Sequence, residues 1–373
     1  MLAAVLLSVN CKSQATSEAS PPAQQQKPAV EEFTADQRAA ALQSARVWHK
    51  PAIPIGQVDF KVNPSGEDAF PSDGDVPCAF TLEPVSGTTP KFNCKMPNGD
   101  VLKVKYGKSN PELFAEVAAS RLLSALGFGA DRMFLVRSVK CAGCPDFPFQ
   151  SLKCLAETGL QTPCFPRPID PKKVSTVKPA VIERRIPGEK IEASKDQGWS
   201  WYELEQIQPK AGGSSLAEVD AFRLMAVFLA HWDNKAENQR LQCVDNARRP
   251  DGSCAKPLAY IQDLGGTFGP TKLDLRNWQA FPMFVDPKNC AVSMNTLPYA
   301  GATFKNRRIS EAGRKFLLDL LQQLSAQQVS DIFTGAGITT YDHPTSAGRD
   351  PRAWTAAFLD KIRQIREAGP CQS

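Results

Sequence analysis

The chain has 373 residues, of which 42% are hydrophobic and 22% are charged, and its formal net charge is +5. This length allows a sizeable core and suits a two-part globular unit with a tail. The positive charge is too small and too scattered for a nucleic-acid-binding surface, so we expect no nucleic acid among its partners. With only 3 histidines, a histidine-rich metal site is not expected, and no apolar run is long enough to span a membrane.

Residues 1–50 are predicted to form a signal segment and a disordered tether. The chain opens with a short apolar run that ends at Cys11 and resembles a bacterial lipoprotein signal. The following Gln-, Ser-, Ala- and Pro-rich stretch cannot build a core. This interpretation predicts export to the periplasm or cell surface, with membrane contact only through a lipid on Cys11. A frayed N-terminus on a cytosolic protein is the alternative.

A strand is predicted over residues 78–84, and a hairpin follows it. The turn of the hairpin is the Asn98-Gly99 pair, which lies between two alternating runs. The second run carries Lys103 and Lys105, which are two residues apart and therefore lie on the same side of a strand. We select Lys105 as the functional lysine, with Lys103 as the alternate.

The segment between this first strand and the hairpin contains Ser86, Gly87, Thr88 and Thr89. Its backbone N–H groups and hydroxyls could bind phosphate, as a backbone nest does, with help from Lys91. The same residue types also form ordinary turns.

A helix is predicted after the hairpin, in ELFAEVAASRLLSALGFG. Pro111 lies near its start and Gly127 at its end, as helix boundaries prefer. Glu116 and Leu123, seven residues apart, share the inward side. Glu116 is therefore the candidate partner of the lysine.

Cysteine usage predicts an oxidising compartment. Without Cys11 the chain has 11 − 1 = 10 cysteines, an even number. Two pairs flank candidate hairpins, where disulfides are geometrically natural: Cys78 with Cys94, and Cys243 with Cys254. A Pro-rich insert, residues 141–178, holds four more cysteines. Structural disulfides are favoured there, and zinc or a redox-active CxxC pair are the alternatives.

Residues 180–191 are predicted to form an apolar strand that runs into a loop, and Glu183 and Arg184 lie at its end. Residues 215–230 then form a helix that is apolar on most sides, and such a helix is buried. It leads directly into the sequence HWDNKAEN. A buried helix fixes the position of the residues that follow it, as a reactive site requires.

The sequence HWDNKAEN contains Asp233, Lys235 and Asn238, and it is followed after two apolar runs by QDLGGTFG, which contains Asp263. In this order the motifs resemble the catalytic and metal-binding loops of the protein-kinase-like superfamily. The resemblance implies that Asp233 takes or orients the proton of an attacking hydroxyl and that Lys235 neutralises the phosphoryl group. Asn238 and Asp263 would bind Mg²⁺ through oxygen atoms.

The same resemblance assigns roles upstream. Lys105, held by Glu116, would bind the α and β phosphates of ATP. Residues 180–191 would be the hinge, where backbone groups at Glu183 and Arg184 bind the adenine edge. The loop SGTTPK is similar to the SGxxPK-like loop of HipA-type kinases and their phosphoinositide-kinase-like relatives.

The implied fold is α+β and two-lobed. Residues 51–190 would form a β-rich lobe and residues 191–373 a mainly helical lobe, with ATP and Mg²⁺ between them. Trp232 replaces the arginine of the HRD motif, so control by a phosphorylated activation loop is not expected. Leu264 replaces the phenylalanine of DFG, which is an apolar exchange.

Four functional hypotheses follow from these motifs. The first is an ATP- and Mg²⁺-dependent phosphotransferase of the cell envelope, acting on a protein or small-molecule acceptor that the sequence does not identify. The second is transfer of AMP on the same fold. A pseudokinase that binds nucleotide or serves as a scaffold is the third, and a disulfide-rich structural protein is the fourth.

Overall fold

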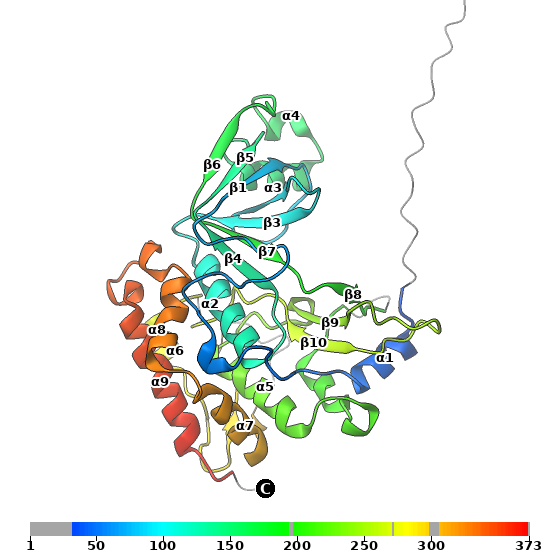
Figure 1. The fold of residues 1–373 in the computed structure, drawn as a ribbon, viewed down its shortest axis with the longest axis vertical. Helices are drawn as coiled ribbons and strands as arrows, with labels where there is room; N and C mark the ends of the chain where they lie inside the picture. Colours follow the sequence, from blue (N-terminus) through cyan, green and yellow to red (C-terminus); the bar gives the residue numbers. More distant parts are fainter. Residues whose placement is uncertain (1–31, 194–196, 271, 298–305, 372–373) are drawn as a thin grey trace, which may run out of the picture. The chain divides into compact units, whose positions relative to one another are not determined.

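The computed structural model describes residues 32–193, 197–270, 272–297 and 306–371. The described chain is α+β, with a strand-rich N-terminal part and a mainly helical C-terminal part (Figure 1). This is the fold class that the sequence predicts. Among the described residues, no helix combines the length and hydropathy needed to span a bilayer.

A seven-stranded sheet organises the N-terminal part, in the order β4-β7-β3-β2-β1-β5-β6. Neighbouring strands are antiparallel except for the parallel pair β1 and β5. The predicted hairpin is β2–β3, and Gly99 in its turn has a φ of 95°, which glycine adopts without a steric penalty. The strands are β1 Asp75–Phe80, β2 Lys91–Lys95, β3 Val101–Tyr106, β4 Arg132–Val136, β5 Ser138–Ala142, β6 Val174–Val177 and β7 Ala180–Arg184.

The predicted insert, residues 141–178, is more integrated than expected. Its two ends belong to β5 and β6, which extend the sheet beyond β1. Between them lie two helices, α3 Pro148–Thr158 and α4 Gln161–Cys164. Leu152 of α3 packs into the small apolar core on one face of the sheet. The segment is therefore part of the N-terminal fold.

Helix α2, Pro111–Leu126, links the sheet to the helical part. The Asn110 side chain accepts a hydrogen bond from the Glu112 N–H, and Gly127 ends the helix, so the predicted boundaries are confirmed. The helix is buried on nearly all sides because it packs against β4, β7 and α8 (Figure 1). Side chains on α2 are consequently held in a fixed position beneath the sheet.

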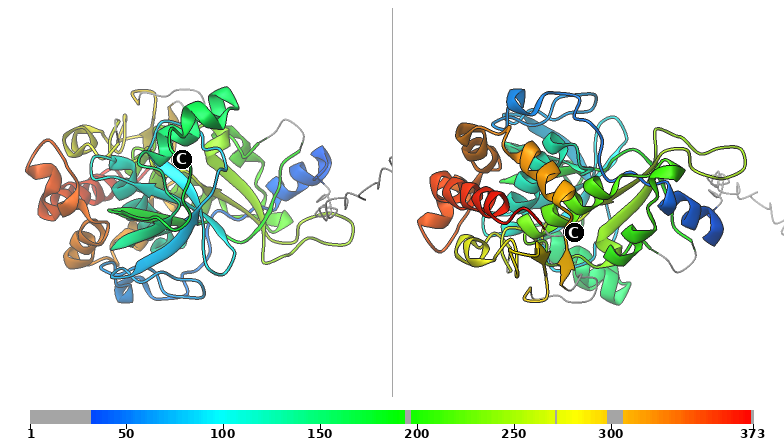
Figure 2. Two further views of the ribbon diagram at one scale, coloured as in Figure 1. Left: turned by 90° about the horizontal axis from the view of Figure 1, so that it is seen from above. Right: turned by 90° about the horizontal axis from the view of Figure 1, so that it is seen from below.

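Helix α5, Leu216–Phe228, is the buried helix that the sequence predicts, and its N-terminus carries a capping box between Ser215 and Glu218. Helices α8 and α9 pack against each other, as the further views show (Figure 2). The other α-helices of this part are α6 Leu275–Ala280, α7 Glu311–Leu321, α8 Ala326–Gly335 and α9 Pro351–Glu367. Its strands are β8 Gly188–Lys190, β9 Gln239–Val244, β10 Pro257–Ile261, β11 Ala291–Val292 and β12 Arg307–Arg308. Short 3₁₀ turns are Ile55–Gln57, Trp201–Gln206, Pro209–Ala211, Ala236–Asn238, Ile338–Thr340 and Ala347–Arg349.

The prediction of a disordered tether is wrong for residues 32–50. Residues 32–50 are folded onto the domain, and they include helix α1, Ala35–Gln43, which begins with a capping box at Thr34. Leu42, Ala45 and Val47 are fully buried, so this segment contributes to the main apolar core. Cys11 and the rest of the predicted signal lie outside the described residues.

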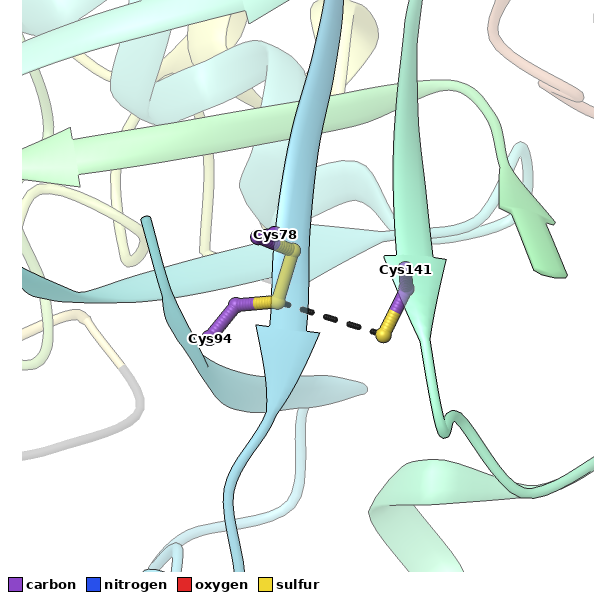
Figure 3. Close-up of side chains that lie close together, drawn as sticks. All are labelled: Cys78, Cys94 and Cys141. Carbon is purple, nitrogen blue, oxygen red and sulfur yellow. Dashed lines mark hydrogen bonds between the residues drawn. A yellow bond between two sulfur atoms is a disulfide. The ribbon is translucent and has the colours of Figure 1, made fainter. Parts of the chain in front are cut away.

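Five disulfides join all ten cysteines beyond Cys11, and they confirm the two predicted pairs, Cys78–Cys94 and Cys243–Cys254. Cys141–Cys144 and Cys154–Cys164 confirm the predicted disulfides in residues 141–178, so these four sulfurs are not free to bind zinc. The first of them is the CxxC pair, whose redox role stays an alternative. Two disulfides are in contact, because Sγ of Cys94 lies 3.9 Å from Sγ of Cys141 (Figure 3).

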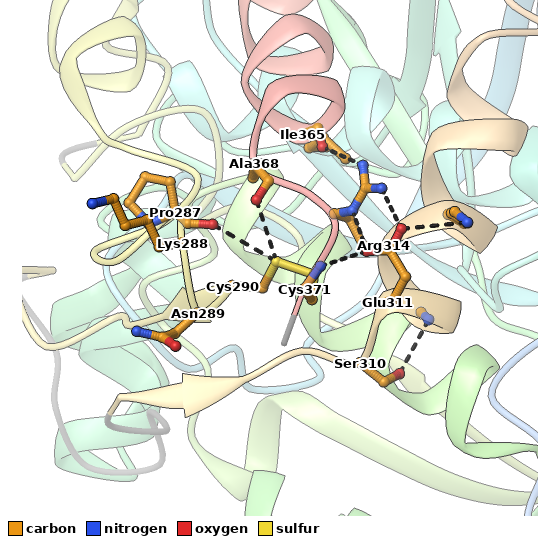
Figure 4. Close-up of a disulfide and its surroundings, with 12 residues drawn as sticks. Pro287, Lys288, Asn289, Cys290, Ser310, Glu311, Arg314, Ile365, Ala368 and Cys371 are labelled. Carbon is orange, nitrogen blue, oxygen red and sulfur yellow. Dashed lines mark hydrogen bonds and ion pairs between the residues drawn. A yellow bond between two sulfur atoms is a disulfide. The ribbon is translucent and has the colours of Figure 1, made fainter. Parts of the chain in front are cut away.

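The fifth disulfide, Cys290–Cys371, fixes the described segment that follows α9 (Figure 4). The backbone N–H of Cys371 donates to the Glu311 carboxylate, which also pairs with Arg314. The sequence shows no hairpin around these two cysteines, so it does not predict their pairing.

Candidate active site

The structure brings Lys105 and Glu116 together, although they lie on different elements. Lys105 on β3 is 3% exposed, and its ammonium forms an ion pair with the Glu116 carboxylate on α2. Lys103, the alternate, points to the same side of β3 but pairs with Glu183 instead. Geometry therefore selects Lys105 as the partner of Glu116.

A second carboxylate on α2, which the sequence analysis did not single out, completes this cluster. Glu112 lies four residues before Glu116, on the same side of the helix, and accepts from Lys105 Nζ at 2.9 Å. It also pairs with Lys272 Nζ at 2.8 Å and accepts from the Thr89 hydroxyl. The signal available in the sequence was the i, i+4 spacing of the two glutamates.

Burial and charge act in opposite directions on these groups. Burial raises the pKa of Glu116, and the neighbouring Glu112 and Asp263 add to this effect against the attraction of Lys105. Burial would also raise the pKa of Glu112, but Lys105 and Lys272 outweigh it and lower that pKa well below its usual range. Glu112 is thus firmly ionised, and Glu116 is the carboxyl of the two that takes up a proton more readily.

The predicted hinge residues point to opposite sides of β7. Glu183 is 4% exposed, and its carboxylate binds Lys103 Nζ through both oxygens, at 2.8 and 2.9 Å, on the same side of the sheet as Lys105. Arg184 turns to the other side, where it pairs with Asp100 at 3.1 Å. The Arg184 side chain is therefore directed away from the candidate site.

The chain leaves the large sheet after β7 and crosses to β8 through residues 185–187. Both backbone groups of Ile186 are already used, because its N–H donates to Asp131 at 2.9 Å and its C=O accepts from Gln242. These bonds fix the path of the connection between the two parts.

The HWDNKAEN and QDLGGTFG segments are held together by backbone hydrogen bonds. The Trp232 N–H donates to the Gly266 C=O at 3.0 Å, and the Phe268 N–H donates at 2.7 Å to the C=O of Leu229, at the end of α5 just before the first segment. His231 is fully buried, and burial lowers its pKa to about 4, so its ring is neutral. His231 therefore packs in the interior, below the loop that carries Asp233.

Asp233, Lys235 and Asn238 gather in one loop after α5. Lys235 Nζ lies 3.7 Å from the Asp233 carboxylate, and both side chains are partly exposed. The Asn238 amide nitrogen donates to the Asp233 C=O at 2.7 Å, which leaves its amide oxygen for another partner. The Asn238 C=O in turn accepts from the Asp263 N–H at 3.1 Å.

Asp263 connects this loop to the cluster on α2. Its carboxylate accepts from the Gly265 N–H at 3.0 Å, and one oxygen from each of Asp263, Glu112 and Glu116 lies within 4.8 Å of the others. Oxygen atoms of Asp263 and Asn238 are donors of the kind that Mg²⁺ prefers. These two residues therefore fit the predicted metal ligands.

The loop between β1 and β2 contributes less directly. Ser86, Gly87 and Thr88 are exposed, whereas Thr89 is buried and reaches Glu112. Lys91 lies beneath the loop, where burial and the nearby Lys105 lower its pKa. Of the predicted phosphate loop, the last threonine is thus the residue that contacts the cluster.

No protein-family model matches the sequence, and no curated protein matches it significantly. Among solved structures, the proinflammatory kinase CtkA of Helicobacter pylori is 12% identical at a TM-score of 0.43, over 79% of this chain and 97% of that chain. The Golgi casein kinase is 13% identical at a TM-score of 0.35, over 87% of this chain and 77% of that chain. Both TM-scores are below 0.5, so neither likeness bears on what this chain does.

Proposed function

We propose that the protein is an ATP- and Mg²⁺-dependent phosphotransferase of protein-kinase-like organisation. The observation that supports this proposal most is the meeting of Lys105, Glu116 and Asp263. These three residues come from a strand, a helix and a distant loop, and the Asp263 carboxylate lies within 4.8 Å of Glu116. A lysine–glutamate pair beside a metal-binding aspartate is the set of groups with which protein kinases hold nucleotide phosphates.

Each group has a distinct task in this proposal. Lys105, held by Glu116, binds the α and β phosphates, while Asp263 and the Asn238 amide oxygen hold Mg²⁺, which neutralises phosphate charge when bound. Asp233 takes the proton of the acceptor hydroxyl. Lys235, which pairs with Asp233 at 3.7 Å, neutralises charge on the transferred group.

The same proposal places the protein outside the cytoplasm. Five disulfides among the described residues are typical of an oxidising compartment such as the periplasm or the cell surface. A lipid on Cys11 would anchor it to the membrane. The acceptor is a hydroxyl of a protein or small molecule in that compartment.

The test combines nucleotide binding with transfer of the γ-phosphate. Calorimetry with ATP and Mg²⁺ should show binding that Asp263→Asn abolishes. Asp233→Asn should still bind ATP but lose transfer of the label to the acceptor or to the protein itself. Asp245→Asn, which changes an exposed carboxylate paired with Lys256, is the matched control and should alter neither. Binding without transfer to the protein itself or to any of a set of protein and small-molecule hydroxyl acceptors would instead favour a pseudokinase, and absence of binding would refute nucleotide chemistry.

A further inference from the structure

The Glu112 carboxylate joins three separate segments of the chain. It is bound by Lys105 from β3, by Thr89 from the loop between β1 and β2, and by Lys272 from the segment after Asp263. The side chain is only 6% exposed. Lys105 already has Glu116 as an ion-pair partner, so Glu112 is not required to neutralise it.

The donors around Glu112 are those that a phosphate group selects. Two ammonium groups and a hydroxyl, directed at one pair of anionic oxygens, serve a phosphate as well as a carboxylate. A cavity of about 310 Å³ adjoins this position and is lined in part by Thr88, Thr89 and Lys272. Room for a larger anion therefore lies directly beside the donors.

The backbone that carries Lys272 is unusual. Lys272 has a φ of 68° and Leu273 a φ of 51°, so two consecutive residues other than glycine adopt the left-handed conformation. This conformation is unfavourable for both, and it is retained where surrounding bonds impose it. The Leu273 N–H donates to Thr267 at 3.0 Å and the Asp274 N–H donates to Phe268 at 2.8 Å, which directs Lys272 toward Glu112.

Glu112 is also fitted closely against the metal-binding loop. A Cβ atom on Gly265 would lie 2.2 Å from Cγ of Glu112, so only glycine leaves space for this side chain. The contact brings Glu112 beside Asp263, where the phosphates of a bound nucleotide would lie. The Glu112 carboxylate and the phosphates of a bound nucleotide would thus compete for the same position.

We propose that Lys272 and Thr89 are phosphate-binding residues, and that Glu112 occupies their donors until a triphosphate displaces it. This inference rests on the proposed function, because it concerns the phosphates of the same nucleotide. It assigns to the segment after Asp263 a direct role in binding the substrate. Glu112 then acts as an internal competitor of the triphosphate.

The experiment compares two isosteric variants on the same helix, Glu112→Gln and Glu116→Gln. Removal of one charged hydrogen-bonding partner changes a dissociation constant by about tenfold. Glu112→Gln should lower the Kd of Mg²⁺-ATP and of inorganic tripolyphosphate about tenfold, because the competing charge is gone. Glu116→Gln should raise both by a similar factor, since Lys105 loses its support.

Lys272→Met should also raise both dissociation constants, about tenfold or more. Its matched control is Lys256→Met, because Lys256 is an exposed lysine paired with Asp245 at 2.9 Å, and that variant should bind like wild type. Thr89→Val, which keeps the shape of the side chain, should weaken binding more mildly. Circular dichroism and the thermal midpoint verify that each variant is folded.

The direction of change decides between the alternatives. If Lys272 and Glu112 only hold the segment in place, both substitutions weaken binding, and the inference is overturned while the proposed function stands. If ATP fails to bind but tripolyphosphate follows the expected pattern, the anion site stands and the nucleotide function falls. If the wild-type protein binds neither, both are refuted.

Discussion

Asp131 provides a test of how the connection between the two parts is held. The carboxyl group is 1% exposed, and Oδ1 accepts from the Ile186 N–H at 2.9 Å and from the Tyr260 hydroxyl at 3.1 Å. Within the described residues, Oδ2 has no partner. Burial, reinforced by the nearby Glu183, raises the pKa of Asp131 from 3.8 to about 6.

This pKa sets both the sign and the size of the pH dependence of stability. Between pH 3.8 and about 6 the folded protein keeps a proton that the unfolded chain has lost, so stability falls as pH rises. The difference of 6 − 3.8 = 2.2 units corresponds to about 3 kcal/mol, at roughly 1.4 kcal/mol per unit. Asp131→Asn keeps an acceptor for Ile186 and does not titrate. Its free energy of unfolding, relative to wild type, should therefore rise by most of this amount between pH 4 and pH 7.5.

Urea denaturation with the disulfides intact, followed by tryptophan fluorescence, measures this difference at the two pH values. Asp245→Asn is the control, because the Asp245 side chain is 66% exposed and its substitution should give a nearly constant difference. The reasoning fails if Asp131→Asn shifts stability equally at both pH values, to within about 0.5 kcal/mol, since Asp131 would then be ionised in a hydrated site.

Two further stability measurements test other parts of the structure. Lys105→Met removes a buried ammonium from between two carboxylates and should cost about 3–5 kcal/mol of unfolding free energy, part of which Glu116→Gln should restore in the double variant. Similar losses from the single and double variants would contradict the buried ion pair. Replacing Cys290 and Cys371 together by serine opens a bridge between residues 81 apart and should lower stability by about 4 kcal/mol in the same assay. An unchanged denaturation midpoint would show that this bridge does not constrain the chain.

Local signals accounted for the elements that the sequence predicted well. The Asn98-Gly99 turn, the Pro111 and Gly127 boundaries of α2 and the apolar helix α5 each depend on a few neighbouring residues. Because side chains alternate along a strand, Lys103 and Lys105 lie on one side of β3. Pairings between segments that lie far apart in the sequence are harder to predict, as the folded residues 32–50 and the strands β5 and β6 show.

The choice between Lys103 and Lys105 illustrates where periodicity stops being informative. Both lysines lie on the same side of β3, and only the cross-strand neighbours separate them, since Lys103 lies opposite Glu183 while Lys105 lies opposite Val181. The Glu183 carboxylate satisfies Lys103 and leaves Lys105 to the glutamates of α2. That distinction required the position of β7, which the sequence does not encode locally.

The balance of charge in the site explains why we assign Glu112 and Lys272 a part in phosphate binding, although neither lies in a recognised motif. Glu112, Glu116 and Asp263 bring three carboxyl groups together, and in the described part of the chain two ammonium groups, those of Lys105 and Lys272, pair directly with them. A triphosphate adds further negative charge, which the buried site can accept only if a carboxylate leaves, a proton is taken up or a cation enters. Glu116, whose pKa burial raises, is the group able to take up the proton. Glu112 is held in its ionised form by Lys105 and Lys272, so displacement is the route open to it. Helix α2 thus carries two carboxyl groups, four residues apart, that respond differently to the charge of a triphosphate. Glu116 can take up a proton, whereas Glu112 is displaced.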